Sequence, residues 1–236
     1  MFEINGKQWE GKRWYAYGTS MTAFPDGYSG YLAKLSGMIL VNRGAPAEGI
    51  TQGFGCSKKA ETRRRVTDPD DGKKTADLIT LEVGPNDTGA PLGSIYDCGG
   101  NTLCGALNAC IRFLQKETAA QIVVLSVTGS RYESKHPEIP VMPEKKLGKS
   151  LPEEERYTRF EMLEAIRRVC ELNGVYYIPV AESCGLGLAR TADSELYVRD
   201  NIHLKDLGGF NAAQFIWSRL KNIPLWYTEI PEEYRR

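Results

Sequence analysis

Histidine is scarce in this sequence: His136 and His203 are the only two among 236 residues. The chain also lacks the Gly-x-Gly-x-x-Gly pattern of dinucleotide sites and the Walker pattern of nucleoside phosphate sites. Its six cysteines form no Cys-x-x-Cys pair and match no zinc-ligand spacing. A reaction that needs a histidine base therefore has two candidate positions, and we expect no metal ion and no organic cofactor.

Neither sign of charge is in excess, because 30 basic residues balance 30 acidic ones. This balance gives no argument for a nucleic acid or an acidic membrane as a partner. The apolar runs have the length of strands and fall short of the roughly 20 residues that a membrane helix needs. The first residues lack the basic-then-apolar pattern of a signal peptide. We therefore expect a cytoplasmic protein, unless a signal has already been removed, and the oligomeric state is not predicted.

Apolar strand patterns alternate with helical patterns along the whole chain. Five strands separated by helices imply a parallel sheet covered on both faces, within a single α/β domain that spans 1–236. Such sheets place their active sites beyond the carboxyl ends of the strands. The expected strands lie near 13–17, 38–42, 77–83, 121–127 and 174–180, and the expected helices near 28–36, 102–117, 157–173 and 206–222.

Three of these strands end in small polar residues. Ser20 follows the first strand and the break at Gly18, where a serine becomes nucleophilic if a base reaches it. Asn86 follows Gly84-Pro85 after the third strand, where its amide could donate to an oxyanion. The loop after the second strand begins Asn42-Arg43-Gly44 and exposes backbone N–H groups. Each segment also has a simpler interpretation: Ser20 or Thr22 as a helix cap, and Asn86-Asp87 as a turn.

Asp200 precedes His203 by three residues, a spacing that places both side chains on one face of a turn or helix start. A carboxylate at one ring nitrogen fixes the tautomer and leaves the other nitrogen to accept a proton. A surface Asp-x-x-His pair without function is the alternative. Cys98 with His136 is a further nucleophile and base pair, but no pattern supports it. Cys104 and Cys110 share the period of an apolar helix and are expected to be free thiols in the core.

Taken in order, these segments resemble the SGNH, or GDSL-type, hydrolase family over roughly residues 13–222. The four family blocks correspond to Gly18-Thr19-Ser20, Asn42-Arg43-Gly44, Gly84-Pro85-Asn86-Asp87, and Asp200 to His203. The resemblance implies a three-layer α/β/α fold with a five-stranded, flavodoxin-like sheet. It also implies that Ser20 is the nucleophile, His203 the base and then the acid, and Asp200 the residue that orients the histidine.

The resemblance further implies an oxyanion hole. Its donors would be the Ser20 N–H, the Asn86 amide and a main-chain N–H of the second block, with Gly84 in support. Gly44 is the nearest candidate in that block, with Ala47 or Gly49 as alternatives. The sequence departs from the family at two places: Thr19 replaces the usual aspartate beside the nucleophile, and Ala47 stands where the donor glycine is usual.

The expected function is a serine esterase that hydrolyses short-chain acyl esters, among them acetyl groups on carbohydrates, through an acyl-enzyme. The substrate would be a small molecule or a glycan ester. Aromatic residues near the first block are candidates for stacking on sugar rings, although several must lie in the core: Trp14, Tyr15, Tyr17, Tyr28 and Tyr31. The alternatives are a non-catalytic glycan-binding module and a phosphate- or flavin-binding protein.

Overall fold

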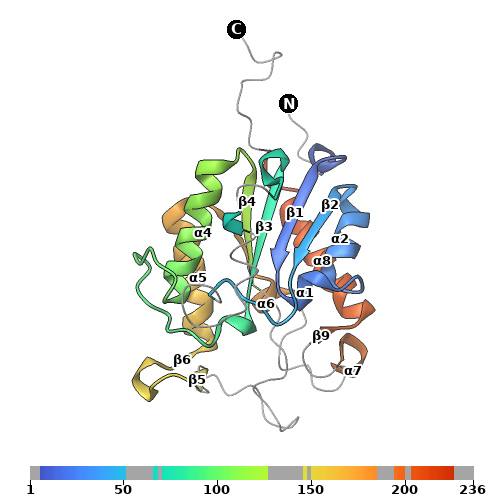
Figure 1. The fold of residues 1–236 in the computed structure, drawn as a ribbon. Coiled ribbons are helices and arrows are strands. Elements are labelled where there is room, and N and C mark those ends of the chain that lie inside the picture. Colours follow the sequence, from blue (N-terminus) through green and yellow to red (C-terminus); the bar gives the residue numbers. More distant parts are fainter. Residues whose placement is uncertain are drawn as a thin grey trace.

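The architecture is a single parallel sheet between two layers of helices (Figure 1). It is seen in a computed structural model that describes residues 6–51, 66–68, 71–126, 146–147, 150–184, 194–199 and 203–225. Residues 127–145 and the tail after 225 lie outside these residues. No helix in the described part of the chain is long and apolar enough to cross a membrane.

The five strands of the sheet follow the order β2-β1-β3-β4-β7, and every neighbouring pair is parallel. This order is the one expected for a flavodoxin-like sheet, so the predicted fold class is confirmed. The register pairs Gly18 with Gly44, and Val83 with Ser126. Four strand ends therefore lie along one edge. The strands are β1 (Arg13–Gly18), β2 (Ile39–Gly44), β3 (Leu78–Val83), β4 (Gln121–Ser126) and β7 (Tyr176–Ile178).

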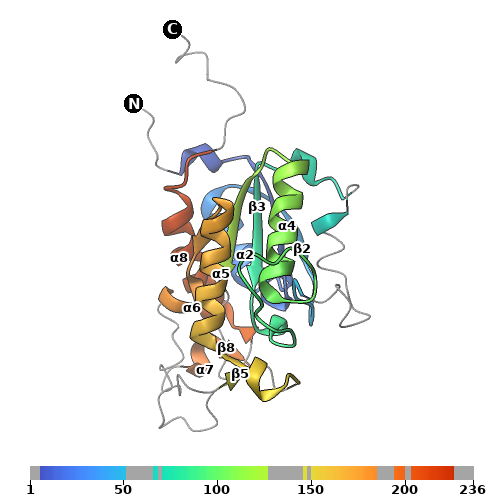
Figure 2. The ribbon, with the colours of Figure 1, turned by 90° about the vertical axis from the view of Figure 1, so that its left-hand side faces the viewer.

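Each face of the sheet is covered by a pair of long helices. Helices α4 (Leu103–Glu117) and α5 (Arg159–Asn173) pack on one face, and α2 (Tyr28–Ser36) and α8 (Asp206–Leu220) on the other. Figure 2 shows α8 and α4 on opposite sides of β3. All four helices begin and end within about two residues of the predicted bounds. The capping box of Thr158 and Glu161 begins α5, a signal readable as Thr-x-x-Glu.

The aromatic residues of β1 belong to the core. Their side chains alternate between the two faces, as in any strand. Trp14 is fully buried toward α2 and α8, while Tyr15 and Tyr17 are buried toward α4. Tyr28 of α2 is buried too, and Tyr31 is half-buried with its hydroxyl on Asp206. Four of the five candidate rings therefore belong to the core and cannot stack on sugars, as expected for several of them, and only Tyr31 keeps an exposed part.

Short elements gather at the carboxyl edge of the sheet (Figure 1). They are α1 (Ser20–Ala23), the 3-10 turn η3 (Pro85–Asp87), α6 (Val180–Ser183), α7 (Ser194–Tyr197), and the antiparallel pair β8 (Val198–Arg199) and β9 (His203–Leu204). The remaining short elements are η1 (Lys7–Trp9), η2 (Lys73–Thr75), η5 (Glu153–Glu155), and the antiparallel pair β5 (Lys146–Leu147) and β6 (Tyr157–Thr158).

Candidate active site

Ser20 and His203 are in direct contact although 183 positions separate them in the sequence. The Ser20 Oγ and His203 Nε2 atoms lie 2.8 Å apart, the distance of a good hydrogen bond. Ser20 is 8 % exposed, so its hydroxyl is sheltered from bulk water. A serine hydroxyl that donates to an imidazole nitrogen is the arrangement of a nucleophile and its base.

Ser20 owes its position to the sharp turn between β1 and α1. Thr19 is the N-cap of α1, and its side-chain oxygen accepts a hydrogen bond from the Met21 N–H at 3.2 Å. The cap is thus neither Ser20 nor Thr22, the two caps proposed from the sequence. This leaves the Ser20 hydroxyl available for His203, while the Ser20 N–H donates to no described residue.

His203 lies on a short strand instead of a turn or helix start. It begins β9 and pairs with Arg199 of β8 in an antiparallel ladder. Phe24 packs edge-on against the imidazole, with ring centroids 5.0 Å apart. Arg199 in turn lies over the Phe24 ring and forms an ion pair with Asp26 at 2.9 Å. The segment after α1 therefore holds the hairpin that carries the histidine.

Asp200 lies outside the described residues, so its place beside His203 stays a prediction. His136 lies outside them as well. Cys98, the alternative nucleophile, is exposed, and its sulfur accepts a hydrogen bond from Arg112 at 2.8 Å. Cys104 and Cys110 are buried in the core, as predicted.

The structure explains Gly44 by close packing and gives it no N–H that is available to a ligand. Its N–H donates to the Asn42 side-chain oxygen at 2.8 Å, so in this conformation it is committed within the loop. A Cβ at Gly44 would come within 2.4 Å of the Ala23 nitrogen, which explains the glycine as a close approach between β2 and α1. The Asn42 amide also donates to the Thr22 carbonyl at 2.7 Å and joins the same two elements.

Ala47 is a better candidate than Gly44 for the backbone N–H donor of the second block. It is the only non-glycine residue with positive φ among the described residues, at 62°, in the left-handed region that favours glycine. Its N–H donates to no described residue. Gly49, the other alternative, is buried, and a Cβ there would meet the Asp87 carboxylate at 2.3 Å.

Asn86 lies in η3, at the same edge of the sheet as Ser20. Its amide donates to the Glu48 carbonyl at 3.1 Å, which fixes the side chain against the second-block loop. An amide nitrogen carries two N–H donors. The sequence therefore identified a residue that joins the second and third blocks, and its contribution to an oxyanion hole stays a prediction.

Two buried carboxylates support these turns, and sequence reasoning gave neither of them a role. Asp87 accepts hydrogen bonds from the Thr51 N–H at 3.0 Å and from the Gly84 N–H at 3.2 Å. Glu82 accepts hydrogen bonds from the Thr19 N–H and the Thr22 N–H, which belong to the turn that carries Ser20. Burial raises the pKa of both carboxyl groups. The available signal was an acidic residue inside the apolar run of β3, because a fully buried glutamate is rare unless it has partners.

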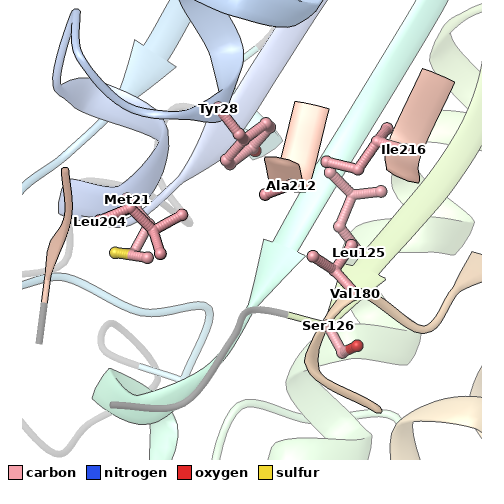
Figure 3. Close-up of a pocket in the computed structure, with 8 residues that line it drawn as sticks. All are labelled: Met21, Tyr28, Leu125, Ser126, Val180, Leu204, Ala212 and Ile216. Carbon is pink, nitrogen blue, oxygen red and sulfur yellow. The ribbon is translucent and has the colours of Figure 1, made fainter. Parts of the chain in front are cut away.

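Figure 3 shows a small apolar cavity and the eight residues that line it. Met21 and Leu204, which directly follow Ser20 and His203, form part of its wall. Its volume of about 10 Å³ holds roughly one water-sized group. The other lining residues come from α2, β4, α6 and α8: Tyr28, Leu125, Ser126, Val180, Ala212 and Ile216. Among the described residues, no group of three or more His, Cys, Asp and Glu side chains could hold a metal ion.

Comparison with solved structures reveals the same architecture in several proteins. A Lactobacillus plantarum protein has 22% identity and a TM-score of 0.70, covering 92% of this chain and 99% of its own. A proposed SGNH hydrolase from Slackia heliotrinireducens has 14% identity and a TM-score of 0.58, covering 89% and 100%. A catalytic mutant of an acetylxylan esterase from Geobacillus stearothermophilus has 12% identity and a TM-score of 0.58, covering 94% and 98%. At such low identity the likeness demonstrates a shared fold.

Sequence comparison is more specific about the family. No curated protein matches the chain. The model of the GDSL-like lipase/acylhydrolase family matches residues 15–209, a range that includes Ser20, Gly44, Asn86 and His203. This protein therefore belongs to the GDSL-like lipase/acylhydrolase family.

Proposed function

We propose that the protein is a serine esterase that hydrolyses short-chain acyl esters through an acyl-enzyme. The observation that supports this most is the 2.8 Å contact between Ser20 Oγ and His203 Nε2. It joins a nucleophile and a base at the carboxyl edge of a parallel sheet, where α/β proteins bind their ligands. Membership of an acylhydrolase family agrees with this chemistry.

In the proposed reaction, the Ser20 oxygen attacks the ester carbonyl carbon while His203 Nε2 takes the serine proton. The tetrahedral intermediate collapses when the histidine returns that proton to the leaving alcohol, and an acyl-serine remains. Water then attacks the acyl carbon with the same histidine as base. The bond between that carbon and Ser20 Oγ breaks, the histidine returns the proton to Oγ, and the carboxylic acid leaves. Asp200 is proposed to orient the imidazole and to stabilise its charged form.

Three donors are proposed for the oxyanion: the N–H of Ser20, the N–H of Ala47 and the amide of Asn86. The two backbone N–H groups have no acceptor among the described residues, and an acceptor that arrives with the substrate would satisfy them. Donors that are already oriented in the resting enzyme stabilise the developing charge without reorganisation. Ala47 replaces Gly44 as the preferred second-block donor because the Gly44 N–H is held by Asn42.

The small cavity supports the choice of a short acyl group. It is lined by the residues that follow the nucleophile and the base, and its roughly 10 Å³ suits a methyl group better than a longer chain. Acetyl groups on carbohydrates are the proposed natural substrates. A structural relative acts as an acetylxylan esterase, and that activity is a proposal for this chain.

The test compares hydrolysis of p-nitrophenyl acetate, butyrate and octanoate by the wild type, Ser20→Ala and His203→Ala. Both variants should lose essentially all activity and keep the fold, because each removes one half of the nucleophile and base pair. Ser218→Ala is the matched control, since its exposed hydroxyl bonds only within α8. His136→Gln controls for the other histidine.

Retention of wild-type activity by Ser20→Ala would overturn the assignment. An active wild type whose activity falls with chain length would support the short-chain specificity. If the wild type hydrolysed none of the three esters, acetate release from acetylated xylan would be measured next. A protein that bound the glycan without releasing acetate would be the glycan-binding module, and a yellow protein with flavin absorbance would be the flavin binder.

A further inference from the structure

The turn that presents Ser20 is tied to β3 by one buried carboxylate, that of Glu82. Its Oε2 atom accepts the Thr19 N–H at 2.9 Å, the Thr22 N–H at 3.1 Å and the Thr22 hydroxyl at 2.5 Å. Its Oε1 atom accepts the Thr19 hydroxyl at 2.7 Å. Ser20 thus lies between two residues that are both held by the same side chain.

Glu82 is a buried acidic residue within the apolar strand β3. It is 3 % exposed, and no basic side chain of the described residues forms an ion pair with it. Removing a carboxylate from water costs several kcal/mol unless hydrogen bonds compensate. All four of the donors that compensate come from the nucleophile turn, so the turn and the carboxylate stabilise each other.

Gly18 and Tyr28, on either side of the Glu82 carboxylate, also fit its presence. A Cβ at Gly18 would come within 2.4 Å of the Glu82 Oε2 atom, so the glycine before the turn leaves room for it. On the far side, the Tyr28 hydroxyl lies 2.7 Å from the Thr22 hydroxyl. Because Thr22 donates its proton to Glu82, Tyr28 must donate to Thr22, and the chain of donors ends at the carboxylate.

This arrangement accounts for Thr19, the departure from the family pattern. A threonine hydroxyl can accept from the Met21 N–H and donate to Glu82 at the same time, and it does both here. An ionised aspartate at position 19 could cap α1 but could not donate, and it would set a second carboxylate against the first. Two carboxylates in contact within a buried site repel each other strongly.

We propose that Glu82 is a positioning residue for the nucleophile, and that its carboxylate supports the turn from β3 in place of the aspartate that the family usually has beside the serine. The proposal rests on the proposed esterase function of Ser20. Glu82 forms its hydrogen bonds with Thr19 and Thr22 and none with Ser20 Oγ, so it would act through these two neighbours. Its effect is to keep the Ser20 hydroxyl within hydrogen-bond reach of His203.

The test uses Glu82→Gln, Glu82→Asp and the double variant Thr19→Asp/Glu82→Gln, which moves the carboxylate to the family's usual position. Asp77→Asn is the matched control, because Asp77 accepts a backbone hydrogen bond at the opposite end of β3. Glu82→Gln should lower kcat for p-nitrophenyl acetate by about 10- to 100-fold, with KM changed less than about threefold, since small misplacement of a nucleophile costs up to roughly 10²-fold. The double variant should recover most of this loss.

A second readout does not depend on catalysis. With only two histidines in the chain, the imidazole NMR signals of His203 and His136 are easily distinguished. The His203 signals at a fixed pH should move in Glu82→Gln and return toward the wild-type position in the double variant, while those of His136 stay unchanged.

Wild-type kcat in Glu82→Gln would overturn the proposal. So would an equal loss in Asp77→Asn, or a double variant that is no better than Glu82→Gln while both are folded by melting temperature. If Glu82→Gln did not fold, a charged Glu82→Asp with lower kcat than the folded double variant would still support the proposal, and the reverse order would contradict it. A wild type inactive on every ester would defeat the esterase function alone, because the His203 signals would still report whether Glu82 positions the serine.

Discussion

Asn86 is the residue whose role is most sharply testable by a single substitution. Its amide is held at the carboxyl edge of the sheet by the Glu48 carbonyl, within the set of proposed oxyanion donors. We predict that Asn86→Ala lowers kcat by roughly 10²-fold or more and leaves KM nearly unchanged, because the donor acts on the transition state. Steady-state kinetics on p-nitrophenyl acetate provide the measurement. An unchanged kcat would remove Asn86 from the oxyanion hole.

Val180 tests whether the small cavity receives the acyl group. It lines the cavity from α6 and is 4 % exposed. Val180→Ala enlarges the cavity by about two methyl groups, so the ratio of kcat/KM for butyrate over acetate should rise by roughly tenfold. Val169→Ala is the control, because it truncates the same buried side chain on α5, in the other core. A ratio that moved equally in both variants would place the acyl group elsewhere.

At the scale of elements, the β8–β9 hairpin depends on a surface network for its orientation. Arg199 pairs with His203 across the ladder, stacks on Phe24 and forms an ion pair with Asp26. The Arg199 and Asp26 side chains are 39% and 32% exposed, so the pair is partly screened and its energetic contribution is small. The ion pair affects the position of the hairpin, because it connects Arg199 of β8 to Asp26 in the segment that follows α1.

We predict that Asp26→Asn and Arg199→Gln each lower kcat/KM by at most about fivefold, the equivalent of roughly 1 kcal/mol. The double variant should be no worse than the poorer single variant, since the two residues act as a pair. Arg167→Gln, which breaks the exposed ion pairs of Arg167 with Glu164 and Glu171 within α5, should leave kcat/KM unchanged. Fully additive losses in the double variant would show that the two side chains act separately.

At the scale of the whole molecule, the buried carboxylates make stability depend on pH. Burial raises the pKa of Asp87 above its ordinary value of 3.8, although hydrogen bonds from Thr51 and Gly84 oppose the shift. Between pH 3.8 and the raised pKa, the Asp87 carboxyl group therefore stays protonated in the folded state and is ionised in the unfolded state. The contribution of this group to stability is fully present below pH 3.8 and is lost as the pH rises through the raised pKa of the folded state.

We predict that the difference in unfolding free energy between the wild type and Asp87→Asn is larger near pH 4 than near pH 7.5. Glu82 contributes in the same direction, because the Asp87 charge helps to raise its pKa and the variant lacks that charge. Urea unfolding at several pH values measures the difference, with Asp77→Asn as the control for removing a carboxyl near β3. A difference that grew with pH would contradict the assigned direction of the shift.

The periodicity of the chain was enough to predict the sheet and its four long helices. Runs such as 78–83 and 103–117 carry their own signal, because burial on one or both faces imposes a period on neighbouring residues. The order of the four short blocks was likewise readable, and with it the candidates Ser20 and His203. Active sites in this fold class lie beyond the carboxyl ends of the strands, so the residues that directly follow a predicted strand are the first candidates.

The contacts that hold the candidate site in place could be recognised only in the folded structure. Glu82 and Thr19 are 63 positions apart, and nothing local indicates that β1 and β3 are neighbours or that Gly18 leaves room for a carboxylate between them. The αL conformation of Ala47 and the commitment of the Gly44 N–H to Asn42 are properties of a loop closed against other elements. Contacts between distant segments depend on strand order and packing, so they appear only when the chain is assembled in three dimensions.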